Sequence, residues 1–123
     1  MRRRFSLLLA CFLVQSAGSV MAQESVEDII LRVWPDDTEH VALKIAHRES
    51  RYVPHVIGCN GRCYGIFQIV FAVHRSWLRE LGIVEPQQLL DPETNAKAAL
   101  KLHQLTNQDW TPWCHGSGFP RYC

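Results

Sequence analysis

Apolar residues recur every three or four positions along most of this chain, and this spacing restricts the fold more than any other feature. It is the spacing that places residues on one face of an α-helix. Runs of alternating apolar and polar residues, which indicate strands, are nearly absent. The sequence therefore predicts a mainly α-helical domain with about four helices around one core and a looped segment between the second and the third.

Capping residues, prolines and glycines mark the ends of the predicted helices. Ser25 opens the first helix and Trp34-Pro35 ends it, whereas Asp36-x-x-Glu39 looks like an acidic capping box for the second. Asp91-Pro92 provides an N-cap and a first-turn proline for the fourth, and Gly82 follows the third. The helices are expected at about residues 26–33, 38–50, 67–81 and 92–103, with a loop at 54–64 and an irregular tail from 109.

The first 22 residues have the composition of an export signal. Three arginines at 2–4 precede an apolar run at 5–14, and Val20-Met21-Ala22 is a small-residue cleavage site. The apolar run is shorter than the about 20 residues that a membrane-spanning helix needs. We expect a signal peptide at 1–22 and one domain at 23–123, in the periplasm or secreted. The alternative is a lipid-anchored protein, because Leu8-Leu9-Ala10-Cys11 resembles a lipobox.

The charge of the chain argues against a nucleic-acid partner. The full chain carries 13 Lys and Arg against 12 Asp and Glu, and removal of residues 1–22 subtracts three Arg and no acid, so the mature balance is 10 minus 12, or −2. Nucleic-acid-binding domains usually carry a marked Lys and Arg excess. About 100 mature residues support one small domain with a modest core, which we expect to be a monomer that benefits from covalent staples.

Four cysteines follow the predicted signal, at Cys59, Cys63, Cys114 and Cys123, and an even number in an exported chain predicts two disulfides. Three connectivities are open. We favour the local pairs Cys59–Cys63 and Cys114–Cys123, because each closes a Gly-containing loop. The alternative is a zinc site of Cys59, Cys63 and Cys114 with His115 or Cys123, but the spacing is loose and export favours oxidation. We therefore expect no metal and no organic cofactor.

Glu49 lies where a carboxylate is unusual, because it extends an apolar helix stripe at i, i+3, i+4 and i+7, formed by Ala42, Ile45, Ala46 and Glu49. The side chain is thus expected to point inward at the C-terminal end of a helix. Loss of water and the negative end of the helix dipole both favour the neutral form that a general acid needs. The alternative is a solvated glutamate that pairs with Arg48 or Arg51.

Three elements of the sequence resemble the soluble lytic transglycosylase and goose-type lysozyme superfamily. In that family a Glu-Ser pair ends a helix and a Gly-x-x-Gln-[Ile/Leu] element follows. Here Glu49-Ser50, Gly65-x-x-Gln68-Ile69 and Asp91-Pro92-x-x-Asn95 occur in this order over about residues 38–113. The resemblance implies a small lysozyme-like helical domain with a disulfide-stapled loop and tail.

The resemblance also implies a peptidoglycan lytic transglycosylase without a cofactor. Glu49 matches the acid that protonates the oxygen between N-acetylmuramic acid and N-acetylglucosamine, and that then acts as base on the C6 hydroxyl to close a 1,6-anhydro ring. Ser50 matches a hydroxyl that faces the cleft, and the alternative is that it merely caps the helix end. Gly65 would let the saccharide approach closely, and the Gln68 amide would bind sugar hydroxyl or acetamido groups. From the pattern alone, Gly65 is equally a turn glycine and Gln68 equally a surface residue.

Aromatic residues provide candidate saccharide platforms, because an aromatic face stacks on the apolar face of a sugar ring. Tyr64, Trp110 and Trp113 are the candidates, and burial is the alternative for each. We expect Trp77 and Trp34 to be the core tryptophans.

Other outcomes remain open. The Ala-Tyr-Asn-x-Gly element of many transglycosylases is missing, and the segment 109–113 stands near its position. Hydrolysis would need a second carboxylate. Of Glu80, Glu85, Asp91 and Asp109, only Asp109 lacks a better structural explanation. A noncatalytic glycan- or envelope-binding module with a structural Glu49 is a further alternative. The expected partners are peptidoglycan glycan strands and, by resemblance, a secretion or pilus apparatus.

Overall fold

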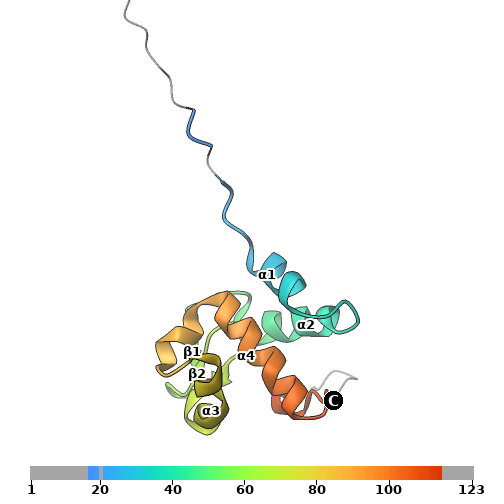
Figure 1. Cartoon of the computed structure of the whole chain (residues 1–123), viewed down its shortest axis with the longest axis vertical. Coiled ribbons are helices and arrows are strands. Elements are labelled where there is room, and N and C mark those ends of the chain that lie inside the picture. The colour runs from blue at the N-terminus through green and yellow to red at the C-terminus, as the bar shows by residue number, and fades with distance from the viewer. Residues whose placement is uncertain (1–16, 20, 115–123) are drawn as a thin grey trace, which may run out of the picture.

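The computed structural model describes residues 17–19 and 21–114, which form a small, mainly helical domain (Figure 1). The predicted helical class is confirmed. The apolar run at 5–14, Cys11, His115 and Cys123 lie outside the described residues. None of the described helices is both long and apolar enough to span a membrane.

The α-helices are α1 (Val26–Val33), α2 (Glu39–Ser50), α3 (Phe71–Leu78) and α4 (Pro92–Leu105). The strands are β1 (Ile57–Gly58), β2 (Cys63–Tyr64) and β3 (Ile69–Val70). The 3-10 helices are η1 (Arg79–Leu81), η2 (Pro86–Leu90) and η3 (Thr111–Trp113).

Side-chain caps begin α1 and α4 where the sequence predicts them. Ser25 Oγ accepts a hydrogen bond from the Asp28 backbone N–H at 3.1 Å, and Asp91 Oδ2 accepts one from the Thr94 N–H at 2.9 Å. Each bond satisfies a backbone donor that has no partner within the helix. The predicted starts of both helices are therefore confirmed.

The start of α2 differs from the prediction. Its N-cap is Thr38, and no side-chain cap is present, so the capping box expected at Asp36-x-x-Glu39 does not form. The Thr38 hydroxyl instead donates to the Pro35 carbonyl at 3.1 Å, because a tight turn precedes the helix. The helix ends before Pro54 as expected, since Arg51 adopts a left-handed conformation with φ of 55°.

The third helix begins four residues later than predicted, at Phe71, and its last turn is the 3-10 helix η1. Residues 65–70 instead form a tight turn and β3. The strands form an antiparallel sheet in the order β1-β2-β3, with Ile57 opposite Tyr64 and Cys63 opposite Val70. The sequence did not predict them, because strands of two residues are too short to show an alternating pattern.

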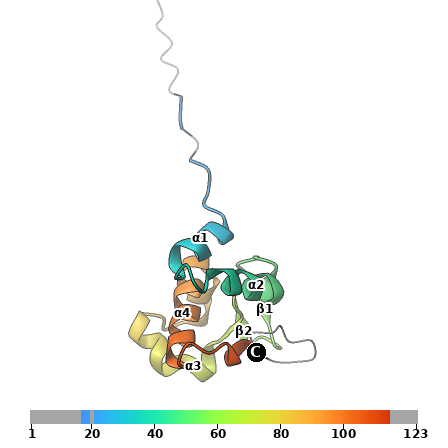
Figure 2. The same cartoon turned by 90° about the vertical axis from the view of Figure 1, so that its right-hand side faces the viewer.

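The core lies between α4 and the elements around it. Helix α4 packs against α1, η2 and β3, while α2 packs against α1. Figure 2 shows α1 and α3 at opposite ends of the domain. The fully buried large side chains include one polar residue; they are Phe67, Ile30, Ile45, Ile66, Ile69, Leu78, Leu89 and Asn95.

The core tryptophans are only partly those that the sequence predicts. Trp34 is buried as expected, with 2% of its surface exposed. The prediction for Trp77 is wrong, because Phe71 and Leu78 are the inward residues of α3 and Trp77 lies half-buried beside His74. Trp113 takes the core position instead, with 4% exposed and its ring 6.1 Å from that of Phe67. The C-terminal turn is thus part of the core.

Candidate active site

Glu49 is the penultimate residue of α2, and its side chain is 26% exposed. The carboxylate is therefore half-buried, which agrees in part with the predicted inward position. Its Oε1 lies 2.8 Å from Nη2 of Arg48, so the alternative prediction of a cationic neighbour is also met. The two side chains therefore form an ion pair at the C-terminal end of α2.

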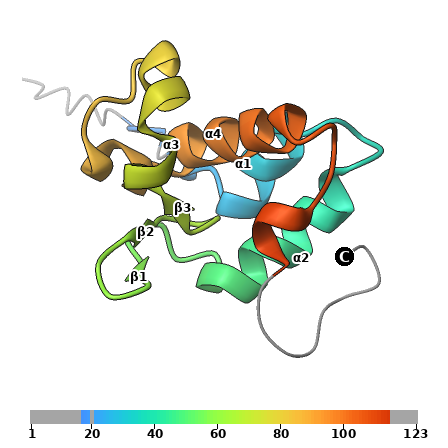
Figure 3. The same cartoon turned by 90° about the horizontal axis from the view of Figure 1, so that it is seen from below.

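Arg48 connects Glu49 to the C-terminal turn. The same guanidinium nitrogen donates a short hydrogen bond to the Trp113 carbonyl. The Trp113 indole N–H in turn donates to the Phe67 carbonyl at 3.0 Å. Figure 3 shows η3 beside α2, in agreement with these bonds. Arg48 and Trp113 therefore link three segments, which are the end of α2, η3 and the Gly65–Gln68 turn.

Ser50 is buried, with 5% of its surface exposed. Its hydroxyl lies 2.9 Å from the carbonyl oxygens of both Ala46 and Ile66 and shares its one hydrogen between them. The bond to Ile66 attaches the end of α2 to the turn that precedes β3. The Ser50 hydroxyl therefore binds the protein backbone, which agrees with the alternative that it serves the helix end.

Gly65 is required by the packing of the protein itself. Its φ is 76°, and a Cβ at this position would lie 2.2 Å from both Asn95 Nδ2 and the Leu89 carbonyl oxygen. The space that a side chain would fill is therefore occupied by protein. The position agrees with the alternative prediction of a turn glycine rather than with a close approach of the saccharide.

Asn95 holds the Gly65 turn in place and was not predicted as a site residue. Its side chain is fully buried; Oδ1 accepts from the Phe67 N–H at 2.9 Å, and Nδ2 donates to the carbonyls of Tyr64 and Leu89 at 2.8 and 2.7 Å. The signal was present in the sequence, because Asn95 lies on an apolar stripe of α4 with Ala99 and Leu102.

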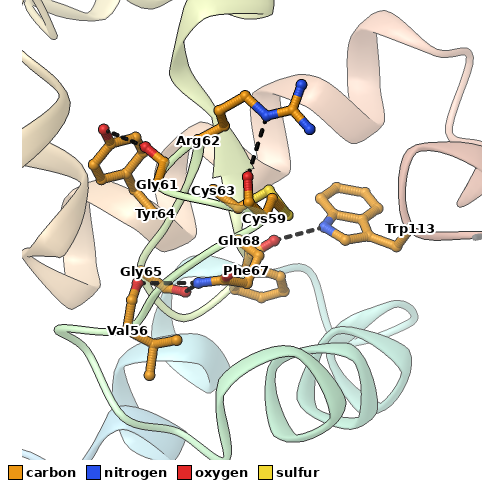
Figure 4. Close-up of a disulfide and its surroundings, with 10 residues drawn as sticks. All are labelled: Val56, Cys59, Gly61, Arg62, Cys63, Tyr64, Gly65, Phe67, Gln68 and Trp113. Atoms are coloured by element: carbon orange, nitrogen blue, oxygen red, sulfur yellow. Dashed lines mark hydrogen bonds between the residues drawn. A yellow bond between two sulfur atoms is a disulfide. The ribbon is translucent and has the colours of Figure 1, made fainter.

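Gln68 is half-buried and uses its amide to bind the protein backbone (Figure 4). Its Nε2 donates to the carbonyls of Val56 and Gly65 at 3.0 and 2.9 Å. Both amide hydrogens are therefore engaged, and the residue fastens the β1-β2 hairpin to the Gly65 turn. Its Oε1, which fills the space beside Gly58, accepts no hydrogen bond within the described residues.

The predicted disulfide between Cys59 and Cys63 is confirmed, with Cα atoms 5.4 Å apart (Figure 4). It closes the β1-β2 hairpin next to Gln68. Because both sulfurs are bonded to each other, they cannot act as the thiolate ligands of the alternative zinc site. In residues 17–19 and 21–114 no cluster of metal-binding side chains occurs. The Cys114–Cys123 pair stays a prediction, since Cys123 is outside the described residues.

The three aromatic platform candidates differ in exposure. Trp113 is buried, with 4% of its surface exposed, which agrees with the alternative prediction of burial. Trp110 is half-buried and stacks on Trp34, with ring centroids 5.4 Å apart. Tyr64 is also half-buried, and its hydroxyl donates to the Gly61 carbonyl at 2.9 Å.

A hollow of about 380 Å³ lies between α3, α4 and η3, and its size is that of a small-ligand pocket. Gln68 and Trp113 both line it, together with mainly apolar residues such as Val73 and Pro112. Glu49 does not line this hollow; it is connected to it by the Arg48–Trp113 bond. We call it the Gln68 hollow.

Asp109, the candidate second carboxylate, serves the local backbone. Its Oδ1 accepts from the backbone N–H of Thr111 at 2.7 Å and also from the Thr111 hydroxyl. These hydrogen bonds lower the pKa of Asp109 below its usual value. The carboxylate therefore holds Thr111, the first residue of η3, from the position before the N-cap Trp110.

A comparison with protein-family models matches residues 35–113 to the family described as Transglycosylase SLT domain. The match covers more than half of the chain and runs from Pro35, just before α2, to the end of η3. Comparisons with curated proteins and with solved structures gave no match. Because the family match includes the Glu49 helix, the Gly65–Gln68 turn and the Asn95 helix, the chain belongs to the transglycosylase SLT domain family.

Proposed function

We propose that this protein is a peptidoglycan lytic transglycosylase in which Glu49 acts first as acid and then as base. The family acts on peptidoglycan, which sets the substrate class. The observation that carries the proposal is the position of Glu49. It is half-buried at the end of α2 and connected to the Gln68 hollow through Arg48 and Trp113.

In the proposed reaction, protonated Glu49 donates its proton to the oxygen that joins C1 of N-acetylmuramic acid to O4 of N-acetylglucosamine. The C1–O bond breaks and positive charge develops on the muramic ring. Carboxylate Glu49 then removes the proton from the C6 hydroxyl, whose oxygen attacks C1. The products are a 1,6-anhydromuramic end and a free N-acetylglucosamine end, and no water is consumed.

Arg48 assists the second half of this cycle. After Glu49 has donated its proton, the guanidinium lies within hydrogen-bond distance of the carboxylate, at 2.8 Å. Arg48 stays in place during this change, because the Trp113 carbonyl is a second acceptor. The base step thus begins from a carboxylate that is already held.

The role of Asp109 favours the transglycosylase outcome over hydrolysis. A hydrolase of this type uses two carboxylates that face the scissile bond. Asp109 is exposed and engaged by Thr111, so it serves the turn and not a water molecule beside Glu49. A single acid that also acts as base suffices for the 1,6-anhydro product.

We further propose that residues 1–22 are an export signal and that the enzyme works in the cell envelope. The folded domain supports this boundary, because Glu24 already forms an ion pair with Arg32 at 2.9 Å and Ser25 caps α1. A secretion or pilus apparatus as partner is a hypothesis from the resemblance. Affinity purification from envelopes would test it, and recovery of the enzyme without envelope machinery would contradict it.

The decisive experiment compares wild-type protein with Glu49→Gln on purified peptidoglycan, followed by mass spectrometry of the digest. We expect anhydromuramic ends from the wild type and a cleavage rate lower by about 100-fold or more for Glu49→Gln. The free energy of unfolding of the variant should equal that of the wild type. Glu80→Gln, at an exposed glutamate of η1, is the matched control and should be fully active. Reducing ends would indicate a hydrolase, and undigested wall that retains the wild-type protein would indicate a binding module.

A further inference from the structure

His103 lies in the last turn of α4 and packs against two tryptophans. Its ring centroid is 4.1 Å from that of Trp110 and 5.5 Å from that of Trp34, and only 3% of its surface is exposed. The two indoles also stack on each other, with centroids 5.4 Å apart. Trp34, His103 and Trp110 thus form one aromatic cluster, and the imidazole is the group in it that can take up a proton.

One nitrogen of this imidazole lacks a hydrogen-bond partner. Its Nε2 is buried and bonds no group within residues 17–19 and 21–114. The ring also forms a hydrogen bond with the Gln108 backbone that raises its pKa, so the ring is the donor. Because the Gln108 N–H already donates to the His103 carbonyl at 2.9 Å, the acceptor is the Gln108 carbonyl and the donor is Nδ1. In the neutral ring, Nε2 therefore carries a lone pair and no hydrogen.

Protonation would place a hydrogen on Nε2 that finds no acceptor in the cluster. The Trp34 Nε1 is also buried and unpartnered in the described part of the chain, but an indole nitrogen only donates. Burial lowers the pKa of His103 below its usual 6.5, and the attraction of Asp37 and Asp109, which face the ring, offsets this only in part. A proton can reach the ring, because His103 lines a hollow of about 190 Å³ together with the exposed Asp37 and Gln104.

Trp110 connects the aromatic cluster to Glu49. It is the N-cap of η3, and its carbonyl accepts from the Trp113 backbone N–H at 2.9 Å. The Trp113 carbonyl in turn accepts from Arg48, which pairs with Glu49. A displacement of Trp110 therefore moves the start of η3, and with it one of the two acceptors that hold Arg48.

We propose that His103 is an acid-sensitive positioning residue for η3. The neutral ring packs against Trp110 and holds η3 in place. The ring that has taken a proton from solvent turns out of the cluster toward water, so η3 loses this support and Arg48 loses the Trp113 carbonyl. Glu49 is then no longer held, and cleavage falls as the pH drops below 6.5. The effect on cleavage rests on the proposed function, whereas the displacement of Trp110 does not.

Nuclear magnetic resonance tests the displacement without any substrate. We expect the His103 ring to titrate with a midpoint below 6.5, and the nuclear Overhauser contact between the His103 and Trp110 rings to disappear below that midpoint. The Trp113 indole N–H signal should shift with the same midpoint. Trp77 is the internal control, because its indole N–H donates to His74 Nδ1 at 3.2 Å and should follow His74 instead. A persistent contact between His103 and Trp110, or a His103 midpoint above 6.5, would overturn the proposal.

A second experiment measures the effect on cleavage as the ratio of the rate on purified peptidoglycan at about pH 5.5 to that at about pH 7.5. His103→Phe keeps a ring beside Trp110 but takes up no proton, so its ratio should exceed the wild-type ratio by about threefold or more. His40→Gln, at an exposed histidine of α2, is the matched control and should keep the wild-type ratio. Any effect of pH on the substrate or on Glu49 itself is common to the three proteins.

The two experiments separate this inference from the proposed function. Equal ratios for His103→Phe and the wild type would refute the link to Glu49. A wild-type protein that loses the contact between His103 and Trp110 in acid but cleaves no peptidoglycan would refute the catalytic proposal alone. Because the resonance experiment uses the wild type, its result stands even where His103→Phe fails to fold.

Discussion

Removal of the Asn95 amide should destabilise the domain more than the loss of any single exposed polar group. In Asn95→Ala the Phe67 N–H stays buried without its acceptor, which costs about 1–3 kcal/mol. The bonds to the Tyr64 and Leu89 carbonyls are lost as well, at about 1 kcal/mol each. The expected decrease in the free energy of unfolding is about 3–5 kcal/mol, a large part of the about 5–15 kcal/mol typical of a domain.

Urea unfolding followed by circular dichroism measures this decrease for Asn95→Ala against the wild type. Gln104→Ala, at an exposed position of the same helix, is the control and should change stability by less than about 0.5 kcal/mol. At a temperature where Asn95→Ala remains folded, peptidoglycan cleavage should still fall, because the Gly65–Gln68 turn has lost its support. A loss of stability below about 1 kcal/mol would refute the proposed role of the buried amide.

Three further predictions concern the same framework. Gly65→Ala should lower the free energy of unfolding by about 2–4 kcal/mol, because its Cβ would meet backbone and Asn95 atoms. The control is Gly82→Ala, which has the same φ of 76° but open space around it and should cost only about 1 kcal/mol. Equal losses in urea unfolding would contradict the steric account. Ion pairs with Arg32 and Lys97 hold the pKa of Glu93 at about 2, below its usual value of 4.5. The Glu93 carboxylate therefore stabilises the fold fully above pH 4.5, and this stabilisation is lost as the pH falls from 4.5 toward 2. Glu93→Gln should reduce this acid dependence of the melting temperature, and an identical pH profile would exclude that contribution. Replacement of the Cys59–Cys63 pair by serines should cost about 2 kcal/mol by the loop-entropy relation, as measured by unfolding without reductant; an unchanged midpoint would show that the hairpin does not need the bond.

Local features of the sequence predicted the helices well, because their signals lie within one helical turn. Ser25 and Asp91 cap helices by bonding residues three positions ahead, and Asn95 and Glu49 interrupt apolar stripes whose period is local. The Cys59–Cys63 pair closes a separation of four residues and was also predicted. The resemblance that identified the family depends on the same short elements, read in order.

The tertiary structure alone decided how these elements meet. Trp113 is buried, although it lies in a short turn whose sequence has no apolar period, because it packs against Phe67, which is 46 positions away. No local pattern therefore predicted that Trp113 and not Trp77 would be the buried residue. Gly65 is required because Asn95, a residue of α4, packs against it. Glu49 is linked to η3 because Arg48 bonds both Glu49 and the Trp113 carbonyl. A local pattern records which face of a helix is apolar, but burial and hydrogen-bond partners depend on chain segments that only folding brings together.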